Sequence, residues 1–414
     1  MLTTGISVAL MFVAFTVTTM VFPYVLSFAR KHHFLDNPSE RKLQRVPVPE
    51  MGGTTVLIGL LVSVIACYFI TWDSRIICIS ALLIVMYIIG LWDDIWDISA
   101  SLRFFLEMFL VWLMILLLGG EINDFHGLWG IHEVPDVVSV PISLIAGVGL
   151  INAINLIDGV DGYCSTYCIM ACAFFAVIFY VFGDMVLFAL ALIAIGALIP
   201  FFFHNVFGKT SKMFLGDEGS LILGSLLAIF MFSVLSKDAS SASFRDLGLS
   251  LPALVLAILA IPVFDTLKVM ISRMVNGHSP FHPDKTHLHH LFIEMNFSHL
   301  MTSGIIVFSN ILIVCALILA WSLGAGIDLQ MYIVILLGFL STWGFYYFME
   351  WNHKMNEGKG SALFHRWSRH GARTSYSDGV LWQFIRKIVD SKLLGGPLPR
   401  EDIGHHHDQQ ITHG

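Results

Sequence analysis

The stretch INAINLIDGVDGY (residues 151–163) sets four polar side chains between two apolar runs, 137–150 and 163–182. The polar side chains are two amides and two carboxylates: Asn152, Asn155, Asp158 and Asp161. The 414-residue chain is 56% hydrophobic and only 13% charged, whereas soluble domains carry about 25% charged residues. Apolar runs of roughly 17 to 25 residues span a bilayer as helices. We therefore expect a membrane protein, in which a polar stretch beside the spans indicates a functional site.

Eleven apolar runs predict the fold class, an all-α polytopic membrane protein with about 11 transmembrane helices. The runs are 5–28, 51–71, 76–92, 104–118, 137–150, 163–182, 185–203, 219–235, 247–272, 304–323 and 331–348. The run 137–150 is short for a span, and we expect its helix to extend toward Asn155.

The basic residues predict the orientation, because loops rich in Lys and Arg stay on the cytoplasmic side. With the N-terminus outside and the C-terminus cytoplasmic, 20 of the 23 Lys and Arg residues face inward. The three that face outward are Arg75, Lys237 and Arg245. The first ten residues hold no Lys or Arg, so we expect the first run to remain as an anchor and not to be removed as a signal peptide.

Five polar loops fall on the predicted inner face, and together they predict a single active site. They are NPSERKLQRVPVPEMGG (37–53), LWDDIWDIS (91–99), NAINLIDGVDGY (152–163), KTSKMFLGDEGS (209–220) and SPFHPDKTHLHHLF (279–292). The predicted outer connections show no comparable clustering of acids with amides, glycines and histidines.

Carboxylates in two of these loops favour magnesium. Asp93, Asp94 and Asp97 end the third run, and Asp93 and Asp97 are four apart, so on a helix they share a face. Three carboxylates repel each other unless a cation neutralises them, and magnesium suits such oxygens where phosphates supply further ligands. Asp217 precedes the eighth run, where helix amides favour anions. The alternatives are an interfacial acidic cap on the third run and an ordinary helix cap at Asp217.

The DGVDG segment predicts a tight loop that presents its carboxylates inward. Asp158 and Asp161 are each followed by glycine, which lets the backbone approach a ligand closely. Asp-Gly pairs also mark ordinary turns. The two nearby amides, Asn152 and Asn155, favour a binding loop over a turn alone.

Two further charged positions have a purely structural alternative. Arg103 and Glu107 lie four apart, and we expect a local pair at the edge of the fourth run. Asp265 lies inside the ninth run, where an acid indicates function by default. A pair with Lys268, three residues further on, would also explain it.

His287, His289 and His290 form a cluster in the last polar loop, after Asp284 and Lys285. Histidine clusters suggest zinc, but the other loops offer carboxylate oxygens, which favour magnesium. We expect imidazolium and lysine groups that face a diphosphate.

In combination, DDIWD, NAINLIDGVDG, FLGDEGS, PVFDT and SPFHPDKTHLHH resemble the polyprenyl-phosphate N-acetylhexosamine-1-phosphate transferases, which are of the glycosyltransferase 4 type. These membrane enzymes move a sugar phosphate from a UDP-sugar onto a lipid phosphate. The resemblance runs from about residue 23 to 295, with the motifs in the family's order. We therefore divide the chain into a transmembrane catalytic domain at 1–349 and a cytoplasmic C-terminal tail at 350–414.

The resemblance implies a role for each matching residue. The implied catalytic residues are Asp93, Asp94, Asp158 and Asp161, and the implied metal ligands are Asp217 and Asp94. The implied substrate contacts are Gln44, Asn155, Asn205, Phe214, Lys285, His287, His289 and His290. Phe214 would stack on the uracil ring, and the histidines would hold the diphosphate or the sugar. Gln44 stands where many relatives have histidine, and the residues around Asn205 also depart from the family's pattern.

The resemblance also implies substrates and a reaction. HLHHLF (287–292) differs from the three-histidine run of the peptidoglycan branch, which favours UDP-GlcNAc as donor and undecaprenyl phosphate as acceptor. The expected cofactor is Mg²⁺, with Mn²⁺ as a substitute, and the expected site is the cytoplasmic face of a bacterial inner membrane. In a single displacement the lipid phosphate would release UMP and start an envelope glycan such as O-antigen, lipopolysaccharide or teichoic acid.

Three alternatives stay open at this stage. UDP-MurNAc-pentapeptide as donor would place the enzyme in peptidoglycan synthesis, and an aspartyl-phosphate intermediate would divide the transfer into two steps. A secondary transporter would also have many spans, but transporters place charges near the midplane within repeated halves, and no repeat is visible here. A homodimer is left open, and no nucleic-acid partner is expected.

Overall fold

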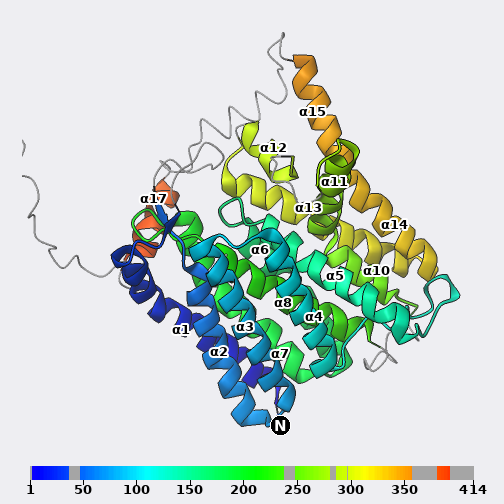
Figure 1. Cartoon of the computed structure of the whole chain (residues 1–414), viewed down its shortest axis with the longest axis horizontal. Helices are drawn as coiled ribbons and strands as arrows, with labels where there is room; N and C mark the ends of the chain where they lie inside the picture. Colours follow the sequence, from blue (N-terminus) through cyan, green and yellow to red (C-terminus); the bar gives the residue numbers. More distant parts are fainter. Residues whose placement is uncertain are drawn as a thin grey trace, which may run out of the picture.

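The computed structural model describes residues 2–36, 47–236, 248–279, 286–295, 297–356 and 380–391. Within these ranges the chain is a bundle of helices with one small β-ribbon (Figure 1). The long helices are α1 (Thr4–Lys31), α2 (Gly52–Thr71), α3 (Ser74–Trp96), α4 (Ala100–Leu118), α5 (Asp136–Leu156), α6 (Tyr163–Phe182), α7 (Met185–Phe207), α8 (Gly216–Leu235) and α13 (His299–Ser322). The shorter helices are α10 (Leu251–Ile258), α11 (Ala260–Val275), α12 (Leu288–Glu294), α14 (Ile327–Phe339), α15 (Phe345–Asn356) and α17 (Val380–Val389). Strands β1 (Leu35–Asp36) and β2 (Val48–Pro49) pair antiparallel.

The apolar runs predicted the spans at the right places. Ten helices in the described ranges are long and apolar enough to cross a membrane, and the last of them is the continuous stretch Ile327–Trp351. The bent pair α10 and α11 adds an eleventh when it is counted as one span. α5 extends to Leu156, as expected for the short run before Asn155.

The ninth apolar run is broken into α10 and α11, which meet at an angle of 74°. Pro262 contributes to the break, because it has no N–H to donate to a carbonyl one turn back. Asn310 of α13 donates to the carbonyl of Ile258 (3.0 Å) and accepts from the N–H of Ile261 (3.1 Å). The hydroxyl of Tyr167 donates to the same carbonyl of Ile258 (2.7 Å). Neighbouring helices therefore satisfy the backbone groups that the bend frees, as buried backbone in a membrane requires.

α8 is the central helix, and 94% of the residues in its most apolar 18-residue segment are buried. It packs against α2, α3, α5 and α6 (Figure 1). Glycines allow α2 and α3 to come close: a Cβ added at Gly53 would collide with Gly219, and one added at Gly90 would collide with Glu218. Close approach through small residues is typical of helix packing in membranes. It brings α2 and α3 directly against the N-terminus of α8.

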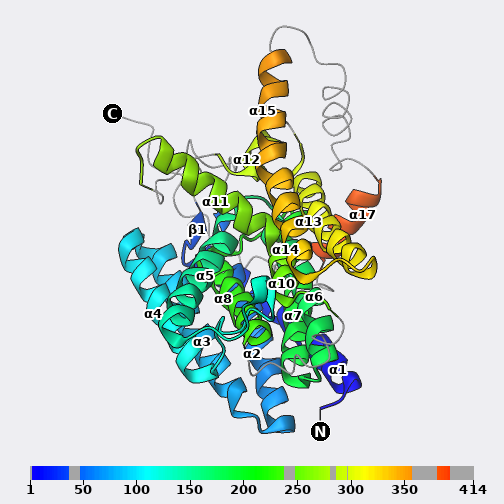
Figure 2. The same cartoon turned by 90° about the vertical axis from the view of Figure 1, so that its right-hand side faces the viewer.

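Contacts between sequence-distant residues define two ends of the bundle. At the polar end, the N–H of Phe214 donates to the carbonyl of Pro49 (2.8 Å), and Asp94 lies against Asp217. α12 and α15 lie toward this end, away from the N-terminus (Figures 1 and 2). The distal end holds the N-terminus and Arg75. Which end faces the cytoplasm stays a prediction from the basic residues.

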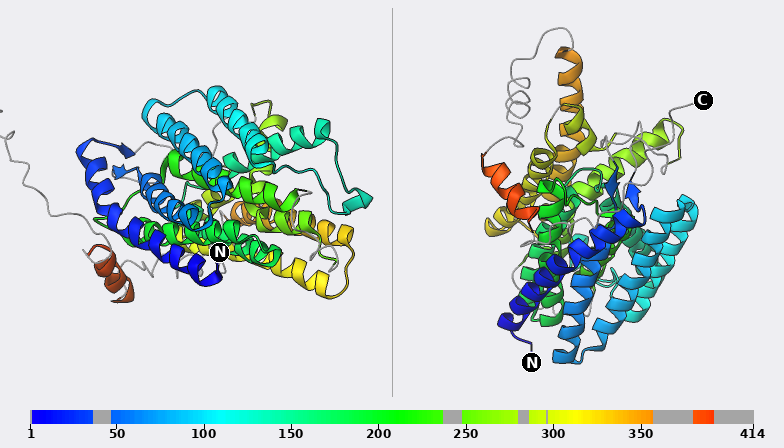
Figure 3. Two further views of the ribbon diagram at one scale, coloured as in Figure 1. Left: turned by 90° about the horizontal axis from the view of Figure 1, so that it is seen from below. Right: turned by 90° about the vertical axis from the view of Figure 1, so that its left-hand side faces the viewer.

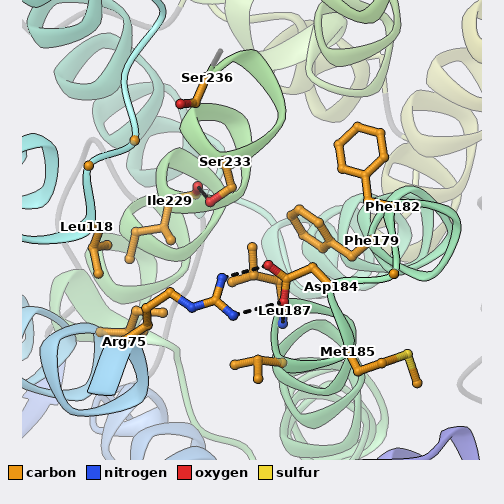
Figure 4. Close-up of a pocket in the computed structure, with 15 residues that line it drawn as sticks. Arg75, Leu118, Phe179, Phe182, Asp184, Met185, Leu187, Ile229, Ser233 and Ser236 are labelled. Atoms are coloured by element: carbon orange, nitrogen blue, oxygen red, sulfur yellow. Dashed lines mark hydrogen bonds and ion pairs between the residues drawn. The ribbon is translucent and has the colours of Figure 1, made fainter. Parts of the chain in front are cut away.

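At the distal end, Arg75 joins the beginnings of α3 and α7. Its Nη1 donates to Asp184 Oδ2 (2.7 Å) and its Nη2 to Asp73 Oδ2 (2.9 Å). Beside this pair lies a cavity of about 530 Å³ between the ends of α3, α4, α6, α7 and α8 (Figure 4). Because it lies at the distal end, this cavity is separate from the predicted active site.

The division at residue 350 stays a prediction. It falls inside α15, which continues the last span through a π-helical turn at Leu340–Gly344. Within the predicted tail, the structure describes the end of α15, the helix α17 and the two residues after α17. α17 packs against α7 at the edge of the bundle (Figure 3). Gln44 and Lys285 lie outside the described residues.

The two ends predict opposite labelling in intact cells. A cysteine replacing Asp97, which is exposed at the polar end, should react with a membrane-impermeant maleimide only after the membrane is opened. A cysteine replacing Glu133, in the loop before α5 at the distal end, should react in intact cells. The unsubstituted chain is the control for the native cysteines. Labelling of Asp97→Cys in intact cells would show that the orientation is the opposite of the predicted one.

Candidate active site

A neighbouring helix caps the N-terminus of α8. Leu215, at the N-cap position of α8, has no side-chain acceptor for the free amides of the helix. Asp94, in the last turn of α3, takes this role: its Oδ1 accepts from the N–H of Asp217 (3.1 Å) and its Oδ2 from the N–H of Glu218 (3.2 Å). Asp217 is therefore not the cap of its own helix, and three carboxyl groups meet at this point.

Arg103 of α4 is a basic partner of Asp217 and of two further acids, Asp93 and Glu107. Its Nη1 donates to Asp93 Oδ2 (2.7 Å) and to Asp217 Oδ2 (3.3 Å), and its Nε lies 3.5 Å from Glu107 Oε1. The predicted local pair with Glu107 is confirmed, but it is the longest of these contacts. Sequence reasoning missed the link to α3 and α8, because the pair with Glu107 already explained Arg103.

Amides of α5 complete the arrangement from another side. Asn155 Nδ2 donates to Asp217 Oδ1 (2.7 Å) and to Ser220 Oγ (2.9 Å). Asn152 Nδ2 donates to the carboxylate of Glu107. Asn155, predicted to contact substrate, therefore also fixes the orientation of Asp217. The carboxylate cluster is defined as Asp93, Asp94, Arg103, Asp217 and Glu218.

Asp97 does not share a helix face with Asp93, contrary to the prediction from their spacing. α3 ends at Trp96, and Asp97 adopts a left-handed φ of 49° and is exposed. Asp93 is buried, and its Oδ1 accepts from the N–H of Ile98 (3.0 Å). The prediction is wrong because the helix ends one residue too early.

The DGVDG loop is a tight turn, as predicted. Gly162 has a φ of +77°, and its N–H donates to Asn205 Oδ1 (2.6 Å). Asp161 Oδ2 accepts from Lys212 Nζ (2.6 Å) and lies 2.9 Å from His299 Nδ1. Burial alone would raise the pKa of Asp161, but the contacts with His299 and Lys212 lower it below its usual value. Asp161 is therefore an ionised carboxylate that ties the loop to two neighbouring segments.

Asp158 has the opposite electrostatic environment. Burial raises the pKa of Asp158 well above its usual value, and neighbouring acidic groups, among them Asp217, add to the rise. No side-chain hydrogen bond or ion pair of Asp158 is found with the residues that the structure describes. Asn155, in the last turn of α5 directly before the DGVDG loop, donates to Asp217 Oδ1 (2.7 Å), so the loop begins beside the carboxylate cluster.

Asp265 fixes the histidine segment from inside the bent span. Its Oδ2 lies 2.9 Å from His287 Nδ1, and its Oδ1 accepts from the N–H of Leu288 (3.1 Å). Lys268 Nζ lies 3.4 Å from Asp265 Oδ1 and stands over the ring of Tyr346, 3.4 Å from its centroid. The predicted pair with Lys268 is confirmed, and a functional role for Asp265 stays a prediction; its contact with His287 ties it to the histidine segment.

His289 joins the histidine segment to the DGVDG loop. Its Nε2 would lie 3.0 Å from a Cβ placed on Gly159, so a side chain at Gly159 would crowd it. Burial lowers the pKa of His289 well below its usual value. Burial therefore disfavours the charged form of His289, and its expected contact with a diphosphate stays a prediction. Its Nδ1 is buried without a hydrogen bond within the described residues, as is Nε2 of His287, whereas His290 is half-buried.

Asn205 lies in the last turn of α7, and Phe214 lies in the loop between α7 and α8. Asn205 is buried, and its Nδ2 donates to the carbonyl of Met213 (3.0 Å). Phe214 is half-buried, and Lys212 Nζ lies 5.5 Å from the centroid of its ring. The contacts of Asn205 hold two loops together, and its role toward substrate stays a prediction. The loop cluster is defined as Asp158, Asp161, Lys212, His289 and His299.

The structure thus brings most predicted site residues to the polar end. They are Asp93, Asp94, Asn155, Asp158, Asp161, Asn205, Phe214, Asp217, His287, His289 and His290. Sequence reasoning missed the roles of Arg103, Lys212, Glu218 and His299. Lys212 and Glu218 already stood inside the quoted motifs, where their charge was the signal, whereas nothing in the local sequence singles out His299.

The carboxylate cluster has the chemistry that a magnesium ion requires. It holds four carboxyl groups and one guanidinium, and both carboxylate oxygens of Glu218 are buried without a hydrogen bond within the described residues. Magnesium prefers oxygen ligands and needs only one or two carboxylates where water and phosphates complete its shell. Among the described residues, no three acidic, histidine or cysteine side chains are placed to hold a metal by themselves, so the magnesium ion stays a prediction. Asp94 and Asp217 are the residues that would hold it.

Comparison with known proteins agrees with the motifs. Residues 76–235 match glycosyl transferase family 4, a segment that covers nearly all of α3 and continues through α8. A probable undecaprenyl-phosphate N-acetylglucosaminyl 1-phosphate transferase of Bacillus subtilis is 29% identical over 300 residues, 72% of this chain and 80% of that protein. The undecaprenyl-phosphate alpha-N-acetylglucosaminyl 1-phosphate transferase of Escherichia coli K12 is 27% identical over 291 residues, 69% and 76% of the two chains. A decaprenyl-phosphate N-acetylglucosaminephosphotransferase of Mycolicibacterium smegmatis is 28% identical over 292 residues, 63% and 69%. The resemblance inferred from the motifs is confirmed.

Replacing Arg103 by alanine should destabilise the protein. Asp93 and Glu107 would lose their cationic partner, and removing one member of a buried pair costs about 3–5 kcal/mol, less here because Arg103 is partly exposed. Thermal unfolding in detergent measures the loss. Arg75→Ala is the matched control, because its ion pairs at the distal end are more exposed. An equal fall in melting temperature for both variants would contradict the special position of Arg103.

Replacing Asp158 by asparagine should stabilise the protein and lower its activity. The Asp158 carboxyl group has a higher pKa in the folded state, so it binds its proton more tightly there. It therefore lowers the free energy of unfolding increasingly as the pH rises above the pKa of an aspartate in the unfolded chain, about 3.9. Asp158→Asn removes this cost, and the gain in unfolding free energy should be larger at pH 7.5 than at pH 4.5. Melting curves at both pH values test this. A loss of stability at both would assign Asp158 a structural role.

Proposed function

Starting from the match to glycosyl transferase family 4, we propose that this protein transfers a sugar 1-phosphate from a UDP-sugar to a polyprenyl phosphate and releases UMP. The favoured donor is UDP-GlcNAc and the favoured acceptor is undecaprenyl phosphate, the acceptor in the names of two bacterial relatives. The observation that carries the proposal is that Asp94 and Asp217 lie together at one end of a membrane bundle, where Asn155, just before the DGVDG loop with Asp158, also contacts Asp217. A lipid-borne and a water-soluble substrate can meet only at such a boundary.

Charge is the main obstacle to this reaction. A phosphate monoester has a second pKa near 6, so the lipid phosphate is largely dianionic at pH 7. It must approach a diphosphate that is also negative. In the described residues, Arg103 and Lys212 bring positive charge to the polar end, from the carboxylate cluster and the loop cluster respectively. Bound between Asp94 and Asp217, Mg²⁺, or Mn²⁺ in its place, would neutralise phosphate oxygens and favour in-line transfer.

The bond changes require no strong base. An oxygen of the lipid phosphate attacks the β-phosphorus of the UDP-sugar, a new P–O bond forms, and the bond to the bridging oxygen breaks as UMP leaves with the electron pair. Asp93 is the candidate for removing any residual proton. Its contacts with Arg103 (2.7 Å) and with the N–H of Ile98 (3.0 Å) hold its carboxyl group in one orientation. We therefore give Asp93 a positioning role first, and propose a single displacement without an aspartyl-phosphate.

The loop cluster suits the nucleotide-sugar. Burial favours the neutral form of His289, and His289 packs against Gly159 of the loop that carries Asp158. Neutral donors and acceptors recognise hydroxyl and amide groups of a sugar better than they bind a diphosphate. Phe214, half-buried beside Lys212, offers a ring face to the uracil base. We propose that the active site faces the cytoplasm of a bacterial cell and supplies the first membrane step of an envelope glycan.

A donor panel with purified protein tests the proposal. UDP-GlcNAc, UDP-GalNAc and UDP-MurNAc-pentapeptide are each offered with undecaprenyl phosphate and Mg²⁺, and UMP release is measured. We expect release with UDP-GlcNAc above the others, dependent on both the lipid and the metal. Preference for the pentapeptide donor would move the protein to the peptidoglycan branch. Absence of UMP with every donor would reject the transferase.

Asp217→Asn is the variant that separates chemistry from folding in the same assay. It keeps the shape of the side chain and removes the charge that would hold the metal, so UMP release should fall by at least about a hundredfold. Its melting temperature should stay near that of the unchanged protein, because the amide can still pair with Asn155. Substantial Mg²⁺-dependent turnover in this variant would remove Asp217 from its proposed role.

A further inference from the structure

α17 attaches a distant C-terminal segment to the loop before α8. Its Trp382 packs on Phe207 at the end of α7, with ring centroids 4.7 Å apart. Arg386 Nε donates to the carbonyl of Phe207 (3.4 Å). The helix thus lies against the last residue of α7, at the edge of the bundle (Figure 1). It lies outside both the family match and the range of the motifs.

Asp390, directly after α17, binds the backbone of this loop. Its carboxylate accepts from the N–H groups of Lys209 (3.3 Å), Thr210 (3.4 Å) and Ser211 (3.0 Å). It also accepts from Ser211 Oγ (2.7 Å). Successive backbone amides form a concavity that favours an anion, and hydrogen bonds to a charged acceptor are stronger than neutral ones. Burial opposes ionisation, but these hydrogen bonds lower the pKa of Asp390 below its usual value.

The loop that Asp390 holds leads directly into the candidate active site. Ser211 Oγ also lies 2.9 Å from His204 Nδ1, inside the end of α7. The next residue, Lys212, reaches Asp161 of the DGVDG loop at 2.6 Å, and Phe214 follows two residues later. On the other side, Arg30 of α1 donates to the carbonyl of Thr210. The loop is therefore fixed between α1, α7 and α17, and its far end carries two residues of the proposed nucleotide-sugar pocket.

We propose that Asp390 is a positioning residue for the nucleotide-sugar pocket: through the amides of 209–211 it holds Lys212 and Phe214 in place. The inference rests on the proposed function, because it assigns these two residues to the UDP-sugar. It gives the C-terminal segment a role in donor binding. Since the held loop faces the DGVDG loop, the effect falls on the donor and not on the lipid acceptor.

Asp390→Ala in the full-length protein tests this assignment. Loss of several hydrogen bonds to a carboxylate should raise the KM for the UDP-sugar about tenfold, and leave kcat and the KM for polyprenyl phosphate within about twofold. Asp390→Asn keeps one acceptor oxygen and should give an intermediate KM. Lys387→Ala is the matched control, an exposed side chain of the same helix, and should change none of these values.

Hydrogen exchange of the amides at 209–211 gives a readout that does not depend on activity. Exchange should be faster in Asp390→Ala than in the unchanged protein, and unaffected in Lys387→Ala. Unchanged exchange would overturn the contact, and faster exchange with an unchanged KM for the donor would overturn the positioning role. If Asp390→Ala does not fold, Ser211→Ala removes one hydrogen bond and should shift exchange and KM in the same direction; no shift in either would overturn the proposal. If the unchanged protein releases no UMP, the proposed function fails, while the exchange result still decides whether Asp390 holds the loop.

Discussion

Charged groups gather at the N-terminus of α8, and the rest of the polar end depends on how their charge is compensated. α8 is the most enclosed of the described spans, and its first turn contacts α2, α3, α4 and α5, with Glu218 fully buried and the Asp217 side chain 35% exposed. Buried charges are costly unless they are paired and hydrogen-bonded. Asp94 caps the helix from α3, Arg103 approaches from α4, and Asn155 approaches from α5. The contacts that compensate the charges at the N-terminus of α8 also bring the carboxylates together at the polar end of the bundle.

Two environments with different electrostatics lie next to each other at this end. The carboxylate cluster has more acidic than basic groups, which suits a cation and the phosphates that it neutralises. In the loop cluster, Asp161 is compensated by Lys212 and His299, whereas Asp158 is half-buried and His289 is buried, and neither has such a partner within the described residues. Under the proposed function, this division would separate the handling of phosphate charge from recognition of the neutral parts of a sugar nucleotide.

Irregular backbone in the bundle has consequences for the site. The bend between α10 and α11 redirects the span that carries Asp265, and Asp265 in turn orients His287 and the start of α12. The loop between α7 and α8 is held on one side by Asp390 and on the other by its pairing with β2. In both places a residue outside the clusters holds a segment that carries predicted site residues.

The sequence by itself determined the spans and the gathering of the motifs, because apolar length and the distribution of Lys and Arg are local properties. From these, Asp94, Asp158 and Asp217 could be predicted to share one end of the bundle. Only the tertiary structure decided that α8 is central, that the ninth run bends, that Arg103 joins Asp93 to Asp217, and that His289 is buried against the DGVDG loop. Each of these depends on which helices touch. Contacts between residues more than a hundred positions apart, such as Arg103 with Asp217, leave no periodic trace in the chain, so burial and pairing had to be seen in three dimensions.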